Sequence, residues 1–413
     1  MHMELERTIA ALSQESLWNG EAMKILITSD WYYPTVNGVV RSVLNLRKGL
    51  MEAGHEVKVL TLVQKKGQFT EAEEEVNQGV YFVPSISAER IYPQARIMKG
   101  YDSKAVQELI QWKPDIIHSQ CEFSTFFLAE RISSKLQIPI VHTYHTVYED
   151  YTHYFSPSKK LGRHVVVGMT RVLTGKVEAV VAPSSKVTEM LEAYGVKCPL
   201  YTIPSGIDTG KYQARVSEER IAQLKQAYTI PQDAPVLVFV GRIAKEKNIS
   251  ELIAFMEQLS NDSLYLLIVG GGPMEEDIEA QVKASPASHR IRLTGMVSPE
   301  QVQEYYQMGD IFVSASTSET QGLTYIESLA NGLPAVCRKD DCLRDVITQG
   351  ENGFQYTNFE EFQAAITTLL TWTCEERKTR ARESARKFST EVFAQNALRM
   401  YEEILTTKPS APL

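Results

Sequence analysis

Short apolar runs alternate with longer amphipathic stretches along almost the whole chain, and this alternation constrains the fold most strongly. Each run has the length of one buried strand, and each stretch between runs can hold a helix. The first set of predicted strands is Ile25–Thr28, Glu56–Leu62, Gly79–Val83, Ile116–Ser119, Ile138–His142, Ala179–Ala182 and Leu200–Ile203. The second set is Val236–Val240, Tyr265–Val269, Ile291–Thr294, Ile311–Ser314 and Ala335–Cys337. Because strands that alternate with helices form parallel sheets, the sequence predicts an α/β fold with two doubly wound sheets.

The sequence also predicts the helices and the division into domains. The expected helices include Val39–Ala53, Ser103–Trp112, Ser124–Leu136, Ser185–Tyr194 and a final amphipathic stretch from Glu391 to Leu405. The length of 413 residues suits two domains, at roughly 100–200 residues each. The turn-rich run 204–209 is the predicted hinge. We expect an extension over residues 1–22, domains over 23–204 and 205–388, a terminal segment over 389–413, and a loop over 64–77.

Composition excludes several classes of protein. The net charge of −8 argues against a general nucleic-acid binder. The cysteines are Cys121, Cys198, Cys337, Cys342 and Cys374. Their spacing does not match a metal site, and a reducing compartment is the simplest interpretation. Since the chain has neither an apolar run of about 18 residues nor an apolar signal-peptide core near its start, we expect a cytoplasmic location.

The run from Glu319 to Glu327, Glu-Thr-Gln-Gly-Leu-Thr-Tyr-Ile-Glu, lies between a predicted strand and the start of a helix. Gly322 would let the backbone approach a ligand closely, and the amides of Leu323 and Thr324 would lie at the helix N-terminus. Such an end favours a diphosphate, because unpaired N–H groups and the helix dipole point at it. Glu327 could then reach the ribose hydroxyls and Glu319 the sugar. Taken alone, the two glutamates could equally lie on a solvated helix.

A second run, Gly241-Arg-Ile-Ala-Lys-Glu-Lys247, follows the strand predicted over 236–240. The guanidinium of Arg242 and the ammonium of Lys247 suit a nucleotide diphosphate and the negative charge that develops when it leaves. Taken alone, this run could be a solvated basic loop.

Together, the two runs resemble the motifs of family 4 of the retaining glycosyltransferases, which use nucleotide sugars and have the GT-B fold. The likeness extends over the chain from Met23 onward. It implies two facing Rossmann-like domains with a cleft between them, where ligands of such sheets bind. The first domain would bind the acceptor and the second the nucleotide sugar, and the last helix would cross back to the first domain.

The resemblance also implies the reaction. A UDP-sugar, UDP-glucose in our interpretation, is the expected donor, with retention at the anomeric carbon and no essential metal. The acceptor would attack from the face of the leaving group, and the diphosphate would take its proton. Arg242 and Lys247 would stabilise the departing diphosphate, and Glu319 would hold hydroxyls of the sugar.

Further residues match the family's pattern less specifically. By resemblance, Gly271 in the turn 270–274 lines the nucleotide pocket, and the backbone around Met296 contacts the base. Gly38 resembles a glycine of the loop that approaches the donor phosphate. His145 is the expected contact to the sugar or the transition state, whereas His142 is expected to pack. The alternatives are ordinary turns at the glycines and a structural role for His145.

The segment from Tyr151 to Val177 indicates the acceptor. It contains no acidic residue, and it combines the basic residues Lys159, Lys160, Arg163, Arg171 and Lys176 with aromatic and apolar residues that include Phe155. Such a composition is typical of segments that lie on anionic lipid. The alternative is a helix that buries its apolar face and exposes its basic residues.

Residues Tyr148 to Phe155 resemble the corresponding segment of bacterial diacylglycerol glucosyltransferases, whose glycolipids serve as membrane components and lipoteichoic acid anchors. This resemblance implies transfer of glucose to 1,2-diacylglycerol, giving the α-glucoside, at the inner face of the cell membrane. The alternatives are a sugar or another envelope lipid as acceptor, a UDP-sugar 2-epimerase, and a silent GT-B partner subunit. The epimerase needs acid and base groups on both sides of the sugar, and a silent subunit typically loses the donor residues that this chain retains.

Overall fold

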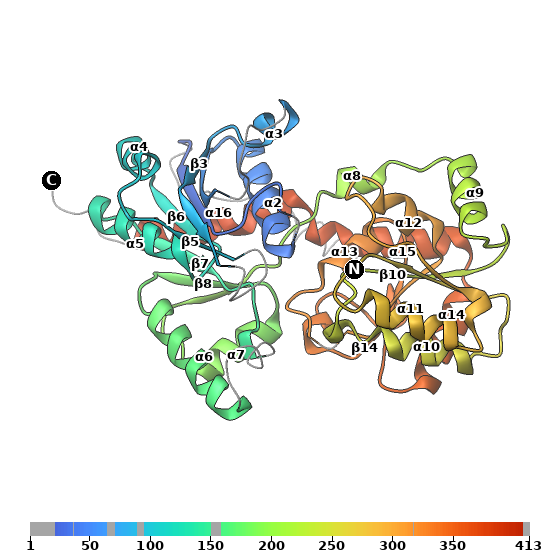
Figure 1. Ribbon diagram of the computed structural model, residues 1–413. Coiled ribbons are helices and arrows are strands. Elements are labelled where there is room, and N and C mark those ends of the chain that lie inside the picture. Colours follow the sequence, from blue (N-terminus) through green and yellow to red (C-terminus); the bar gives the residue numbers. More distant parts are fainter. Residues whose placement is uncertain are drawn as a thin grey trace, which may run out of the picture.

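The computed structural model describes residues 21–35, 37–63, 71–88, 95–149, 158–316 and 318–407. Within these ranges the chain forms two parallel sheets, each covered by helices on both faces (Figure 1). The prediction of an α/β fold with two doubly wound sheets is therefore confirmed.

The first sheet has the strand order β3-β2-β1-β6-β7-β8-β9. Its strands are β1 (Lys24–Ser29), β2 (Glu56–Leu62), β3 (Val80–Val83), β6 (Ile116–Ser119), β7 (Ile140–Thr143), β8 (Ala179–Ala182) and β9 (Leu200–Thr202). Each overlaps a run that the sequence predicted. In β1, Leu26 packs into the apolar cluster on one face of the sheet, and Ile25 and Ile27 pack into the cluster on the other. This alternation explains why the runs are mostly apolar, without a polar face.

The helices of the first domain are α2 (Gly38–Glu52), α3 (Glu71–Val76), α4 (Lys104–Trp112), α5 (Ser124–Leu136), α6 (Lys159–Thr174) and α7 (Ser185–Tyr194). The prediction of a loop over 64–77 is wrong for 71–76, where the glutamate- and alanine-rich sequence forms α3, consistent with the helix propensity of these residues. Residues 64–70 lie outside the described part of the chain. A short hairpin of β4 (Ser85–Ser87) and β5 (Arg96–Met98) was not predicted.

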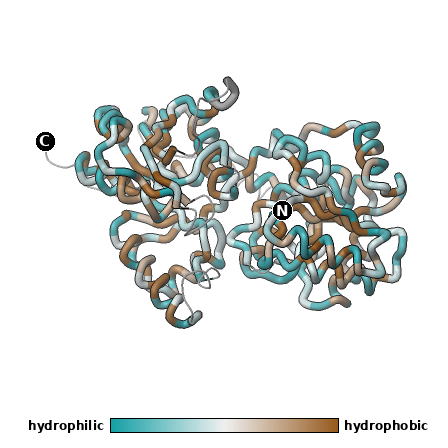
Figure 2. The backbone as a smooth tube through the Cα atoms, viewed as in Figure 1, coloured by the Kyte–Doolittle hydropathy of each residue, from teal (hydrophilic) through white to brown (hydrophobic). Residues whose placement is uncertain are grey.

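The second sheet has the strand order β12-β11-β10-β13-β14-β15. Its strands are β10 (Val236–Val240), β11 (Tyr265–Val269), β12 (Ile291–Leu293), β13 (Ile311–Ser314), β14 (Ala335–Arg338) and β15 (Gly353–Tyr356). Its helices are α8 (Thr209–Gln213), α9 (Glu218–Ala227), α10 (Ile249–Gln258), α11 (Glu275–Ala284), α12 (Val302–Met308), α13 (Leu323–Ala330), α14 (Phe359–Thr371) and α15 (Cys374–Ala385). Hydrophobic stretches follow the sheets of both domains in Figure 2.

The last helix, α16 (Thr390–Thr407), lies against the first domain although it follows the second along the chain (Figure 1). Its apolar residues join the cluster formed by β1 and α2. The approach to α2 is close, because a Cβ on Gly49 would lie 2.7 Å from the carbonyl oxygen of Thr390 and 2.8 Å from Cβ of Ala394. The hydroxyl group of Tyr401 also contacts Nδ1 of His118 at 2.6 Å.

The segment that joins the two domains is tied to α2. Ser42 donates a hydrogen bond to Ser205 (2.8 Å), and the side-chain amide of Asn45 donates to the carbonyl oxygen of Gly206 (2.7 Å). These bonds fix the inner side of α2 to the connecting segment, so the beginning of α2 faces the second domain.

Candidate active site

Two helix N-termini meet where the domains face each other. A Cβ on Gly38, the first residue of α2, would lie 3.8 Å from Cδ1 of Leu323, the first residue of α13. Since α2 follows β1 and α13 follows β13, the carboxyl ends of the two sheets lie on either side of this contact. The arrangement brings Gly38, Leu323 and Thr324 together at a point suited to an anion.

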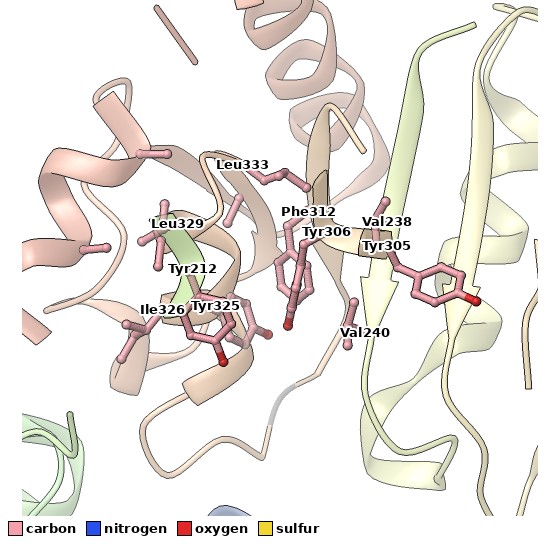
Figure 3. Close-up of a cluster of buried hydrophobic side chains, with 14 of the residues drawn as sticks. Tyr212, Val238, Val240, Tyr305, Tyr306, Phe312, Tyr325, Ile326, Leu329 and Leu333 are labelled. Carbon is pink, nitrogen blue, oxygen red and sulfur yellow. The ribbon is translucent and has the colours of Figure 1, made fainter. Parts of the chain in front are cut away.

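The turn before α13 requires glycine. Gly322 has a φ of +79°. A Cβ at this position would lie 2.7 Å from Cδ2 of Tyr325 and 2.9 Å from Cδ2 of Leu343, both of which are fully buried. Below α13, the rings of Tyr306, Phe312 and Tyr325 pack together (Figure 3). The N-terminus of α13 is therefore held in place by the core of the second domain.

Glu319 is held from both domains. Its carboxylate pairs with Nζ of Lys247 at 2.5 Å, and its backbone N–H donates to the carboxylate of Asp340 at 3.3 Å. From α7 of the first domain, Lys186 donates to the carbonyl oxygen of Glu319 (3.1 Å) and to Asp340 (2.8 Å). Ser184 donates to the carbonyl oxygen of Thr320 at 2.6 Å. These contacts place Glu319 and Lys247 at the domain interface.

Glu327 lies one helical turn inside α13, and its side chain is only 3% exposed. The hydroxyl group of Tyr306 donates to Oε2 of Glu327 at 3.2 Å. Oε1 forms an ion pair with Arg41, which belongs to α2 of the first domain. The second predicted glutamate is thus also paired with a cation.

The turns after β10 and β11 pack directly on each other. A Cβ on Gly270 would lie 2.0 Å from the carbonyl oxygen of Gly241, and one on Gly272 would lie 2.4 Å from that of Ile243. The turn after β10 also contains Arg242, whose side chain is exposed. This close packing explains the glycine-rich sequence after β11.

The residues predicted to surround the base lie next to these turns. Gly271 lies beside Met296, with 3.4 Å between its ideal Cβ and that of Met296. The side chain of Met296 is 81% exposed. The structure thus brings Gly271 and Met296 together next to the turn that carries Arg242.

The first domain contributes a buried polar group at the ends of β6 and β7. Nε2 of His145 lies 2.7 Å from Oε1 of Gln120. Burial lowers the pKa of His145 to about 4, so its imidazole is neutral near pH 7. Tyr148 donates to Glu122 (2.6 Å), whose other oxygen lies 3.5 Å from Nε2 of His142. His142 is buried, and within the described chain neither of its ring nitrogens has a hydrogen-bond partner.

Sequence reasoning missed five polar residues of the candidate site: Arg41, Gln120, Glu122, Lys186 and Asp340. Gln120, Glu122 and Asp340 come shortly after strands whose carboxyl ends face the interface. The sequence does show that these three residues follow predicted strands, and this position could have identified them as candidate site residues. Arg41 and Lys186 lie in the first turns of α2 and α7, and their partners are distant in sequence.

The basic segment forms α6 and exposes apolar residues. Leu161, Val165 and Val172 are 57%, 54% and 63% exposed, whereas Val166 and Leu173 are buried. The helix therefore packs one set of apolar residues against the first domain and exposes another set.

The described basic side chains of α6 are exposed as well, and Arg171 donates to the carbonyl oxygen of Tyr194. Lys160, Arg163 and Arg171 are exposed, and Arg163 pairs with Glu149 at 2.8 Å. Tyr151 and Phe155 lie outside the described residues, and only the backbone of Lys159 is described. The outer side of α6 is thus both basic and apolar.

In the described ranges, His, Cys, Asp and Glu side chains do not gather in threes in a way that could hold a metal ion. Over the same residues, the helices are too short or too polar to cross a membrane.

Comparison with known proteins identifies the family. A profile described as "Glycosyltransferase Family 4" matches residues 36–211, and one described as "Glycosyl transferases group 1" matches residues 220–388. The alpha-monoglucosyldiacylglycerol synthase of Streptococcus pneumoniae is 32% identical over 386 residues, which cover 92% of this chain and 85% of that protein. The synthase of the same name from Acholeplasma laidlawii is 34% identical over 350 residues, covering 82% and 86% respectively. The chain belongs to family 4 of the glycosyltransferases.

Solved structures agree on the fold. Anabaena Alr3699/HepE in complex with UDP-glucose has a TM-score of 0.67 and 18% identity, covering 94% of this chain and all of that one. Sucrose-phosphate synthase from Thermosynechococcus elongatus has a TM-score of 0.68 and 19% identity, with 94% and 100% coverage. The chain is thus a glycosyltransferase with the GT-B fold, as its two motifs predicted.

Proposed function

We propose that this enzyme transfers glucose from UDP-glucose to 1,2-diacylglycerol with retention, forming α-monoglucosyldiacylglycerol. The observation that carries the proposal is the similarity, over more than four fifths of the chain, to two proteins named alpha-monoglucosyldiacylglycerol synthase. The basic and apolar outer side of α6 supports a lipid acceptor, because such a surface suits an anionic membrane.

In the proposed donor complex, the diphosphate lies between Gly38 and the N-terminus of α13. The amides of Leu323 and Thr324 and the side chains of Arg242 and Lys247 bind it. Gly271 and the backbone near Met296 border the base. The hydroxyl groups of the ribose bind Glu327, and those of the glucose bind Glu319.

The chemistry follows from this placement. The oxygen of the free hydroxyl group of diacylglycerol attacks the anomeric carbon from the side of the leaving group. The bond from that carbon to UDP breaks, and the proton of the hydroxyl group passes to the departing phosphate oxygen. Arg242 and Lys247 stabilise the charge on UDP. His145, neutral because partial burial lowers its pKa, contacts the sugar without adding positive charge near the developing oxocarbenium ion.

The acceptor side is proposed to lie on the membrane through α6. Leu161, Val165 and Val172 would enter the region between headgroups and acyl chains, with Lys160, Arg163 and Arg171 near anionic lipid phosphates. Lys159, Tyr151 and Phe155 belong to the same proposed contact. The first domain would thereby meet its acceptor at the membrane surface.

Incubation with radiolabelled UDP-glucose and mixed micelles of diacylglycerol and anionic lipid, followed by extraction into chloroform, tests the reaction. Label should appear in the organic phase as an α-glucoside, identified from the anomeric proton by NMR. Glu319→Gln should abolish it, whereas Glu279→Gln, an exposed glutamate on α11, should not. Release of UDP only when free sugars are supplied would refute the lipid acceptor and favour the runner-up, a sugar acceptor. Conversion of the donor without any acceptor would indicate an epimerase.

Membrane contact is tested separately with anionic and neutral vesicles. Leu161→Asp combined with Val165→Asp should abolish sedimentation with anionic vesicles while leaving the melting temperature unchanged, because both side chains are exposed. Met51→Asp is the matched control, since Met51 is 50% exposed at the far end of α2. Equal vesicle binding by the α6 variant and the control would refute the membrane contact.

A further inference from the structure

Arg41 reaches across the domain interface to a buried acid. It is the fourth residue of α2 in the first domain, and it pairs with Glu327 in α13 of the second. The side chain of Arg41 is 32% exposed, whereas that of Glu327 is 3% exposed. The guanidinium group thus lies at the boundary between solvent and the buried carboxylate.

The same pattern occurs at the other predicted glutamate, because Glu319 pairs with Lys247. Both acids proposed to bind donor hydroxyl groups are therefore paired with cations. A nucleoside diphosphate sugar brings hydroxyl groups for the acids and a dianionic diphosphate for the cations. Binding can exchange both sets of partners without leaving a buried charge unpaired, which would be costly.

The distances along the helices allow Arg41 to make this exchange. Gly38, three residues before Arg41, lies next to Leu323 at the N-terminus of α13. Glu327 is four residues after Leu323, about 6 Å along the helix axis at 1.5 Å per residue. An arginine side chain can cover this distance by rotating about its own bonds. Its planar fork of donors suits phosphate oxygens as well as a carboxylate.

We propose that Arg41 is a diphosphate ligand of the donor site, held on Glu327 until the donor arrives. The inference rests on the proposed donor complex, in which Glu327 binds the ribose. Release of Glu327 to the ribose frees Arg41 to bind the diphosphate at the N-terminus of α13. Since α2 is also bonded to Ser205 and Gly206 in the connecting segment, this contact links the nucleotide in the second domain to the position of the first.

Calorimetric titration with UDP and with uridine tests the role of Arg41. Arg41→Gln should weaken UDP binding about ten- to a hundredfold, the effect of one charge-assisted bond to phosphate. Uridine binding should not weaken, because the substitution removes the competitor for Glu327. Arg41→Lys should recover part of the UDP affinity. The matched control is Lys48→Gln, which removes another cross-domain cation, paired with Asp208 at 2.5 Å, and should change neither affinity.

The double variant Arg41→Gln, Glu327→Gln guards against misfolding, because it leaves no buried charge unpaired. Compared with Glu327→Gln alone, it should lose affinity for UDP and not for uridine. Equal losses of affinity for UDP and for uridine would mean that Arg41 only positions the site. Tighter binding of both ligands would mean that Arg41 only competes with the ribose. Either result would overturn the proposal.

A parallel titration with GDP and guanosine separates this inference from the proposed donor. If wild-type protein binds GDP and not UDP, the UDP-glucose assignment fails. The role of Arg41 is then decided by the same comparison on GDP and guanosine. Loss of GDP affinity alone in Arg41→Gln would support it, and equal loss of both would refute it.

Discussion

Gly38 and Gly322 lie on opposite sides of the proposed diphosphate, and alanine at each should have a different consequence. Gly322 has a left-handed backbone, and its ideal Cβ would lie 2.7 Å and 2.9 Å from two buried side chains. At Gly38 a Cβ would meet only Leu323, at the ordinary distance of 3.8 Å. The two substitutions therefore separate the stability of the turn from the space that the diphosphate needs.

The expected destabilisation by Gly322→Ala has two sources. A left-handed backbone costs a non-glycine residue about 1–2 kcal/mol, and forcing a methyl group into a packed core typically costs about 1–3 kcal/mol. Together they should lower the free energy of unfolding of the second domain by about 2–5 kcal/mol. Tyr325 and Leu343 are fully buried and cannot turn away into solvent to relieve the contact.

Gly38→Ala should leave stability unchanged or raise it by less than about 1 kcal/mol, because alanine favours a helix more than glycine does. Its methyl group would occupy space between the two helix N-termini, so the affinity for UDP should fall by about tenfold or more, the equivalent of 1.4 kcal/mol.

Urea unfolding followed by circular dichroism, with calorimetric titration of UDP, measures both effects. The reasoning is refuted if Gly322→Ala unfolds at the wild-type urea concentration. It also fails if Gly38→Ala binds UDP as tightly as the unsubstituted protein.

Three further outcomes follow from the charges of the site and the buried histidines. Gln120→Glu puts a carboxylate beside His145, which should raise the pKa of His145 from about 4 by about 1–3. The acid limb of the pH–rate profile should therefore move to higher pH. An unchanged profile would contradict the contact between the two side chains. Burial lowers the pKa of His118 to about 3. The stability that this histidine contributes above its unfolded pKa of about 6.5 is therefore lost as the pH falls toward 3, by at most about 1.4 kcal/mol per pH unit. In His118→Gln, the free energy of unfolding measured by urea titration should change less between pH 6 and pH 4 than in the wild-type protein. An equal change in the two proteins would contradict this role of His118. Because Arg242, Lys247 and the N-terminus of α13 supply positive charge to the diphosphate, dialysis against a chelator should leave the transfer rate unchanged; loss restored by a divalent cation would contradict this.

Local patterns in the sequence predicted most of the fold. The strands of the first sheet are continuous apolar runs, as expected where helices cover both faces, and the runs predicted for the second sheet form β10 to β14. The strand β15, Gly353–Tyr356, was missed because Gly-Phe-Gln-Tyr is short and contains a polar residue. The strands β4 and β5 have three residues each, too few for a period to be recognised.

The turn from Glu319 to Glu327 could also be predicted from the sequence, since its strand, glycine and helix are contiguous. The residues that pair with its two glutamates were harder to predict. Lys247 was recognised as part of a motif, but Arg41 is 286 positions from Glu327, and Lys186 is 133 positions from Glu319. Neither contact has a local signal, because each arises from the orientation of one domain on the other.

The ion pairs at Glu327 and Glu319 explain how the charges of the two acids in the proposed donor site are compensated. A buried carboxylate without a partner is costly, so each glutamate of the proposed donor site needs a compensating cation. Arg41 on Glu327 and Lys247 on Glu319 supply the compensating charge. Arg41 belongs to the opposite domain from Glu327, so this ion pair forms only when the domains are together. In the proposed donor complex the diphosphate would replace both carboxylates as the partner of these cations, and this part of the domain interface would belong to the donor site.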